Sequence, residues 1–147
     1  MSEQSAIAER ALALVGTPFR LGGRDPASGI DCIGLAALAL GGADDVPSGY
    51  ALRGGDGARW HRWFEGRGFA KIAGGGPGDL CLVRAAPLHF HLLVAVTGGF
   101  VHAHAGLRRT VFLPGASLWP IDSFWRLKDC PSPARAGEGY GALRRRR

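Results

Sequence analysis

The spacing of hydrophobic residues changes about half-way along the 147-residue chain. Residues 4–15 place apolar side chains at helical intervals, and residues 31–40 (DCIGLAALAL) are apolar on every side, as in a helix buried inside a domain. From residue 79 onward the apolar residues fall in short β-rich segments separated by turn residues, at 79–85, 89–96, 99–105, 108–113 and 123–127. Helices followed by strands predict an α+β domain with an antiparallel sheet.

The connecting segments complete this division of the chain. Residues 17–30 and 41–57 are rich in Gly and Pro and are predicted to be loops, and residues 58–67 (ARWHRWFEGR) predict a short aromatic helix. After Cys130 the composition is dominated by Pro, Gly, Ala and Arg. We therefore expect one domain over residues 1–130 and a disordered basic tail over residues 131–147.

The net charge of +6 is concentrated in this tail. Residues 131–147 hold five arginines and Glu138, which sum to +4, so the first 130 residues carry only +2. A high isoelectric point that arises from a tail does not indicate a nucleic-acid-binding domain. Nucleic acid is accordingly not an expected partner.

The start of the chain and its apolar runs bear on where the protein acts. Residues 1–16 contain Glu3 and Glu9 and lack the basic region and apolar stretch of a signal peptide. No apolar run approaches the ~20 residues that a membrane-spanning helix needs. We expect synthesis in the cytoplasm without a signal peptide and no membrane span.

Cys32 follows Asp31 at the start of the predicted buried helix. A helix N-terminus presents unpaired N–H groups and a partial positive charge, which favour a reactive thiolate. A buried structural cysteine is the alternative, because free cysteines are often buried. Cys81, inside a predicted strand, and Cys130, at the tail boundary, are expected to be inert. No CxxC pair occurs, so neither a zinc knuckle nor a disulfide framework is predicted.

Four of the five histidines lie within 16 residues, at His89, His91, His102 and His104. The alternation of side chains along a strand places each pair on one face. Such a cluster has three interpretations: a polar face exposed to solvent, a zinc site, or a catalytic base with an orienting partner. Only the third also uses Cys32.

The turn between the two histidine strands decides which histidines meet. A two-residue turn points all four to one face; at Thr97–Gly98 it makes His102 a diagonal neighbour of His91, and at Gly98–Gly99 it gives His104 that place. A three-residue turn would separate the two pairs. The residues alone leave this choice open.

Taken together, these segments resemble the NlpC-type cysteine peptidases, papain-like enzymes that hydrolyse the stem peptides of bacterial cell wall. The resemblance covers about Glu9 to Leu127 and is carried by the order and spacing of four segments: GTPFRLGG at 16–23, IDCIGLAAL at 30–38, PGDLCLV at 77–83 and HLLVAVTGGFVHA at 91–103. It implies a papain-like α+β fold with a cysteine at a helix N-terminus, packed on an antiparallel sheet. It also implies an enzyme that uses no cofactor and no metal.

The resemblance assigns roles residue by residue. The cysteine of the family's Asp-Cys-Ser-Gly motif falls on Cys32, the catalytic histidine on His91, and the orienting histidine on His102. His104 remains a rival for that last role and otherwise belongs to the substrate side. His89 has no family role and is expected to be a surface or substrate-side residue.

The implied substrate-binding positions depart from the family pattern. Asp31 matches, but Phe19 stands where the family usually has Tyr, and Ile33 where it has Ser. These positions help some members to recognise the amino end and D-Glu of the stem peptide. The usual substrate preference is therefore in doubt, whereas the catalytic residues are kept.

The loop pattern Pro47, Tyr50 and Trp60 is most similar to a subgroup carried by phages and gene transfer agents. This similarity implies tail proteins as partners, peptidoglycan stem peptide as substrate, and action in the periplasm during DNA entry. The main alternative is a tail protein that keeps the fold but binds murein without cleaving it. Zinc binding by the histidines is a third possibility.

Overall fold

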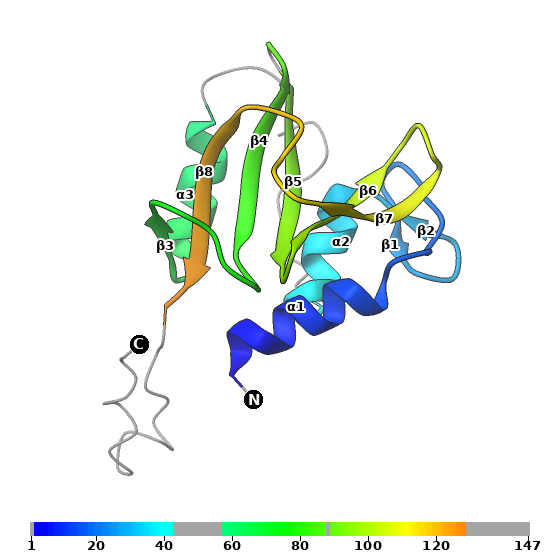
Figure 1. The fold of residues 1–147 in the computed structure, drawn as a ribbon, viewed down its shortest axis with the longest axis horizontal. Coiled ribbons are helices and arrows are strands. Elements are labelled where there is room, and N and C mark those ends of the chain that lie inside the picture. Colours follow the sequence, from blue (N-terminus) through cyan, green and yellow to red (C-terminus); the bar gives the residue numbers. More distant parts are fainter. Residues whose placement is uncertain (1, 43–56, 88, 129–147) are drawn as a thin grey trace.

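A computed structural model of the protein describes residues 2–42, 57–87 and 89–128. The predicted tail at 131–147 and most of the predicted loop at 41–57 lie outside the described residues. Within them, three α-helices and two antiparallel sheets form an α+β domain (Figure 1), as predicted.

The helices are α1 (Glu3–Ala13), α2 (Cys32–Ala39) and α3 (Ala58–Gly66). The Ser2 hydroxyl accepts the N–H of Ser5 and caps α1, which packs its buried face against α2. Seven of the eight residues of α2 are buried, in agreement with its uniform apolarity. In the described part of the chain, no helix has the length and apolarity needed to cross a bilayer.

The main sheet has the strand order β3-β8-β4-β5-β6-β7, and every neighbouring pair is antiparallel. Two further strands, β1 (Arg24–Asp25) and β2 (Gly29–Ile30), form a small hairpin before α2. The strands of the main sheet are β3 (Phe69–Ile72), β4 (Leu80–Ala86), β5 (His89–Val96), β6 (Gly99–His104), β7 (Arg109–Pro114) and β8 (Ile121–Leu127).

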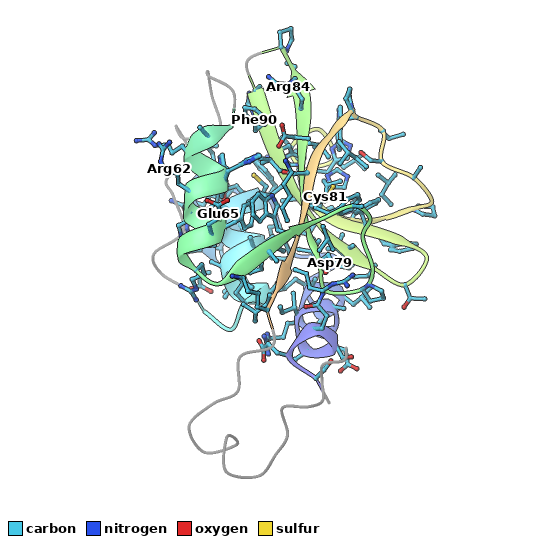
Figure 2. The ribbon with its side chains drawn as sticks, turned by 90° about the vertical axis from the view of Figure 1, so that its left-hand side faces the viewer. Arg62, Glu65, Asp79, Cys81, Arg84 and Phe90 are labelled. Atoms are coloured by element: carbon cyan, nitrogen blue, oxygen red, sulfur yellow. The ribbon has the colours of Figure 1, made fainter. Side chains whose placement is uncertain are left out.

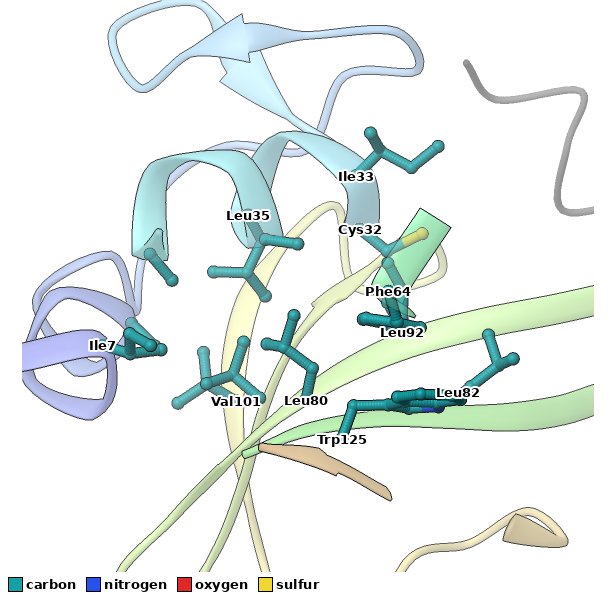
Figure 3. Close-up of a cluster of buried hydrophobic side chains, with 14 of the residues drawn as sticks. Ile7, Cys32, Ile33, Leu35, Phe64, Leu80, Leu82, Leu92, Val101 and Trp125 are labelled. Carbon is teal, nitrogen blue, oxygen red and sulfur yellow. The ribbon is translucent and has the colours of Figure 1, made fainter. Parts of the chain in front are cut away.

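The alternation of side chains along β4 and β5 divides the core into two clusters. Even-numbered residues such as Leu80, Leu82 and Leu92 face the helices and join Ile7, Leu35 and Trp125 in the larger cluster (Figure 3). Odd-numbered residues, with a partner from β6, form a second cluster on the other face: Cys81, Val83, Leu93, Ala95 and Phe100. Both faces of these central strands are therefore covered, which explains their nearly continuous hydrophobicity.

The strands β5 and β6 separate along their length. Their ladder holds only at the turn, where Val94 pairs with Val101, Ala95 with Phe100 and Val96 with Gly99. Beyond these pairs β6 stays with β7, and Figure 1 shows both strands turning away from β4 and β5. The start of β5 and the end of β6 therefore lie outside their shared ladder.

Helix α3 is attached to β8 by aromatic and polar contacts. The rings of Phe64 and Trp125 stack with centroids 4.7 Å apart. His61 Nε2 lies 2.8 Å from Asp122 Oδ2, and the Trp125 indole N–H donates to the Ser123 hydroxyl at 2.8 Å. These contacts close the end of the domain away from β6 and β7.

The predicted elements match the observed ones closely, with three omissions. Residues 89–96 were predicted as a strand with the bounds that β5 has, and the predicted helix at 31–40 corresponds to α2. The strands β1, β2 and β3 were not predicted, because each is only two to four residues long. Segments this short show too little alternation to be recognised from sequence.

The first turn of α1 is fixed to the sheet through the carboxylate of Asp79, which is fully buried. Arg126 donates two hydrogen bonds to it, at 2.9 and 2.8 Å, and the Gly76 N–H donates a third at 2.6 Å. The Gln4 side-chain amide also donates to Asp79. Figure 2 shows Asp79 and Arg84 toward opposite ends of β4, so this network lies far from the start of β5.

Replacement of Asp79 by Asn should destabilise the domain by about 3 kcal/mol, because it leaves Arg126 without its charged partner and breaks a buried network. Urea unfolding measures the free energy. The matched control is Glu3→Gln, which removes an exposed ion pair to Arg10 and should cost less than about 1 kcal/mol. Equal losses in the two variants would show that the Asp79 network does not stabilise the fold as described.

Candidate active site

The carboxylate of Asp31 begins α2 and organises the loop before it. Asp31 is the N-cap residue, and its Oδ1 accepts the Gly34 N–H at 2.9 Å. Oδ2 accepts the Gly22 N–H at 2.7 Å, and Arg24 Nη1 lies 3.0 Å from Oδ1. One buried carboxylate thus connects the helix start to the loop, and Arg24 balances its charge.

Glycines allow this loop to lie against the helix. A Cβ atom at Gly34 would lie 2.2 Å from the carbonyl oxygen of Gly23, and a Cβ at Gly23 would lie 2.1 Å from that of Gly29. Neither distance is possible for a side-chain carbon, so both positions require glycine. Gly34, in the segment IDCIG, is therefore required by the close packing of the helix against the loop.

Cys32 is the first residue of α2 and is 5 % exposed. Burial raises the pKa of its thiol to about 12, although backbone N–H groups of Leu92 and of Cys32 itself act in the opposite direction. Asp31 adds to the rise, and Arg24 opposes it. The expectation that the helix N-terminus would favour a thiolate is therefore wrong for this state of the protein, because desolvation outweighs the helix.

The turn between β5 and β6 is Thr97–Gly98, because Val96 pairs with Gly99. Gly98 has a φ of +84°, the left-handed conformation that hairpin turns of this length use. Of the alternatives left open by the sequence, this turn is the one that brings His102 to His91. His91 Nε2 and His102 Nδ1 lie 3.3 Å apart, with the ring planes nearly perpendicular at 87°.

One pocket of about 600 Å³ contains both the thiol and the histidine cluster. It opens where β5 and β6 separate, and its lining includes Cys32, His89, His91, His102, His104 and Trp119. All four histidines line this pocket, as expected for a two-residue turn between β5 and β6. Cys32 and His91, about sixty positions apart in sequence, line the same cavity.

The two histidines in hydrogen-bond contact are held in their neutral forms. Burial lowers the pKa of His91 to about 3, and the neighbouring His102, His89 and His104 lower it further. Burial and the nearby His104 lower the pKa of His102 to about 4. The Cys32 thiol and the rings of His91 and His102, which all line this pocket, are therefore uncharged at neutral pH.

The hydrogen bond between the imidazoles constrains where their protons lie. Two neutral rings can bond only if one nitrogen donates and the other accepts. When His91 Nε2 carries the proton and donates to His102 Nδ1, the lone pair of His91 is on Nδ1, the ring nitrogen that does not take part in this bond. In that tautomer His91 can accept a proton from a thiol.

The predicted substrate-side residues have different positions. Phe19, His104 and Asp31 line the pocket, although both oxygens of Asp31 already accept hydrogen bonds. Ile33 does not reach the pocket: it is fully buried in the larger core cluster. Its side chain packs inside the protein, so the expectation of a substrate contact at Ile33 is corrected.

Three residues of the site were not found from the sequence. Trp119 lies in the pocket wall against both His91 and His102, Leu21 forms part of the wall and is 79 % exposed, and Arg24 pairs with Asp31. Trp119 lies in a loop with no periodic pattern, 17 residues after His102. Leu21 lies in a Gly-rich loop, and its exposure is a property of the fold that the sequence alone does not show.

The described residues contain no group of three or more His, Cys, Asp or Glu side chains arranged to hold a metal ion. The zinc interpretation of the histidine cluster therefore receives no support from their geometry.

The sequence matches no protein-family profile and no curated protein. Solved structures do match. The NlpC/p60 domain of the peptidoglycan hydrolase SagA has a TM-score of 0.57 at 23% identity, over 84% of this chain and 98% of that one. The peptidoglycan hydrolase RipB of Mycobacterium tuberculosis has a TM-score of 0.60 at 17% identity, over 87% and 66%. The chain has the NlpC/P60 fold.

A third match shows how the fold is used in longer chains. NlpC1 of Trichomonas vaginalis has a TM-score of 0.57 at 20% identity, and the match covers 84% of this chain but 45% of that one. This chain thus spans less than half the length of NlpC1. At these identities the likeness establishes the papain-like NlpC/P60 fold, which confirms the predicted fold class.

The pH dependence of the alkylation rate should show that the Cys32 thiol is neutral at pH 7. Because burial raises its pKa to about 12, the rate of its reaction with iodoacetamide should increase about tenfold per pH unit between pH 6 and pH 9. Cys81 is the internal control, since it is fully buried in the second core cluster and should react only on unfolding. Mass spectrometry of a Cys130→Ser variant measures both rates. A plateau below pH 8 would instead reveal a preformed thiolate.

The histidine pair should make the domain sensitive to acid. The pKa of His102 is about 4 in the folded protein and about 6.5 when unfolded, so the unfolded chain binds more protons between these values. Stability should therefore be lost as the pH falls from 6.5 toward 4. Urea unfolding at pH 7 and pH 4.5 should show that His102→Gln reduces this loss by about 2 kcal/mol. Leu118→Ala, at an exposed position without a titrating group, should show the full loss.

Proposed function

We propose that this protein is a cysteine peptidase that hydrolyses amide bonds in peptidoglycan stem peptides. The observation that carries the proposal is the shared pocket. A cysteine at a helix N-terminus opens into the cavity that holds two hydrogen-bonded imidazoles. The NlpC/P60 fold supports the substrate class, since SagA and RipB are described as peptidoglycan hydrolases.

In the proposed reaction Cys32 is the nucleophile, His91 the base and His102 the orienting residue. The Cys32 thiol gives its proton to His91 Nδ1 while its sulfur attacks the amide carbonyl. The C–N bond then breaks, the leaving amine takes the proton from His91, and a thioester remains on Cys32. A water molecule gives a proton to His91 and attacks the thioester, which releases the acid and returns the proton to the sulfur.

The raised pKa of Cys32 and the lowered pKa of His91 suit proton transfer during the attack rather than before it. Burial opposes a lone thiolate and a lone imidazolium. When the two charges form together, their mutual attraction in a poorly solvated pocket offsets much of that cost. The proposed enzyme therefore rests in its neutral form and becomes charged only with a substrate in place.

The developing oxyanion would be stabilised at the start of α2. The first N–H groups of a helix have no partner inside the helix. The Gly34 and Leu35 N–H groups donate to Asp31, through its side chain and its carbonyl respectively. The Cys32 N–H is the first of the helix, directly after the N-cap residue Asp31, and is the proposed oxyanion donor.

We extend the proposal to the setting of a phage or gene-transfer-agent tail, with action in the periplasm. Its support is the loop similarity, of which Pro47 and Tyr50 lie outside the described residues. Trp60 is fully buried in the larger core cluster, so it contributes packing. Purified particles from a producing culture should contain the protein, and its absence from them would contradict this setting.

A second candidate function is murein binding without cleavage, by a tail protein that retains the fold. The burial of the Cys32 thiol favours it, because that thiol is almost wholly neutral at pH 7. The two functions differ in whether the sulfur is needed.

Digestion of purified sacculi should separate them. Cys32→Ala should reduce the release of soluble fragments by roughly 10³-fold or more, because it removes the nucleophile. The matched control is Cys81→Ala, which changes the same residue type in the second core cluster and should retain most activity per folded molecule. Chromatography of the fragments measures the rate.

Sedimentation of the same variants with sacculi tests binding. A peptidase should bind through Cys32→Ala without cleaving. Equal fragment release by wild type and Cys32→Ala would end the peptidase proposal. Binding without release by both proteins would establish the murein-binding function instead.

A further inference from the structure

We propose that Trp119 is a positioning residue for the His91–His102 pair: its indole fixes the orientation of both imidazoles and keeps water from them. Only the expected effect of Trp119 on catalysis rests on the proposed function. The positioning itself is a property of the folded protein and can be measured without a substrate.

The contacts of Trp119 with the two histidines are similar to each other. The indole centroid lies 5.3 Å from the His91 ring, with the planes at 80°, and 5.3 Å from the His102 ring, with the planes at 85°. The two imidazoles are themselves 5.4 Å apart and inclined at 87°. Three rings thus meet edge to face in one triangle, the arrangement that aromatic pairs prefer.

Trp119 is held through its backbone and through its side chain. The Ser117 hydroxyl accepts the backbone N–H of Trp119 at 3.0 Å and donates to the backbone carbonyl of Trp119 at 2.9 Å. The Trp119 side chain is partly buried and packs against the second core cluster. Trp119 therefore links the second core cluster to the histidine pair, because His91 lies on the same face of β5 as Leu93 of that cluster.

This placement has a chemical consequence for His91. The hydrogen bond to His102 places one ring nitrogen, but a single hydrogen bond leaves the plane of the imidazole free to tilt about it. A perpendicular contact with a fixed indole limits that tilt and so directs the other ring nitrogen. Such alignment matters because small misplacements of a reacting group reduce rates by up to ~10²-fold.

The indole also controls the solvation of the pair. His91 is faced by His89 on its own strand, by His102 and His104 on β6, and across the pocket by Cys32 and Asp31. Removal of the indole would admit water to the histidines without changing any of these groups. Hydration favours the imidazolium form, so the titration of His91 should move to higher pH.

The experiment is a pH titration of the histidine rings by ¹⁵N NMR, which reports the tautomer and the protonation of each ring. In Trp119→Ala the titration midpoint of His91 should move up by about one pH unit or more. Trp119→Leu, which keeps apolar volume against the second core cluster but lacks the ring, should do the same and serves if the alanine variant does not fold. Trp119→Phe should restore the wild-type behaviour.

The matched control is Leu118→Ala, at the adjacent position, whose side chain is 71 % exposed. It should leave the titration of every histidine unchanged. An unchanged His91 midpoint in both Trp119→Ala and Trp119→Leu would overturn the inference. A change in the melting temperature alone, without a change in titration, would reduce Trp119 to a packing residue and also overturn it.

Activity provides the second readout and separates the two proposals. If wild type digests sacculi, Trp119→Leu should lower kcat by about 10- to 100-fold with little change in KM. A rise in KM at unchanged kcat would make Trp119 a substrate contact and contradict positioning. If wild type digests nothing, the proposed function fails, and the NMR titration still decides the role of Trp119.

Discussion

The carboxylate of Asp31 is the interaction on which the site depends. It lies almost fully buried and accepts hydrogen bonds from the start of α2 and from the loop before it, with Arg24 as its charged partner. A carboxylate out of water is costly unless its oxygens are occupied and its charge is balanced. Here both conditions are met by groups from three segments of chain, so the carboxylate fixes where these segments meet. The position of Cys32, one residue later, follows from that meeting.

The second requirement is the separation of β5 from β6. A sheet that stayed paired would place Leu93 opposite His102 and close the space in which the pocket lies. Because pairing ends at Val94 and Val101, the start of β5 is free to face the N-terminus of α2 while β6 continues with β7. The same hairpin thus supplies both the turn that sets the His91–His102 contact and the separation at which the pocket opens.

The strongest periodic signals in the sequence predicted the fold well. Uniform apolarity over residues 31–40 predicted a buried helix. The alternation of histidines at 89, 91, 102 and 104 predicted one face for each pair, and a common face for all four if the turn had two residues. These are local properties, determined by the geometry of one helix or one hairpin. They sufficed for the α+β class, for α2 and for the two candidate turns, of which Thr97–Gly98 is the observed one.

Properties that depend on packing could not be predicted in this way. The contact of Trp119 with the histidines depends on the path of an irregular loop, which the sequence does not define. Ile33 was predicted to contact the substrate but lies in the core, because the packing of α2 against its neighbours sets the rotation of the helix. The pairing of Asp31 with Arg24 depends on the hairpin of β1 and β2, whose strands are too short to show a pattern. The pKa of Cys32 belongs to the same class, since it depends on how completely the helix end is enclosed.

Because of that enclosure, the fold alone does not determine whether Cys32 and His91 are charged. In this chain the fold places the start of α2 and the start of the internal strand β5 at one pocket, which Cys32 and His91 both line. Whether the pair becomes charged depends on solvation, to which Trp119, Phe19 and the surrounding apolar wall contribute. A wall that excludes water opposes the charges of the resting protein, but it also strengthens every interaction that a bound amide makes with them. In the proposed reaction, the same burial that keeps Cys32 neutral in the free protein would favour charge separation once a substrate fills the pocket.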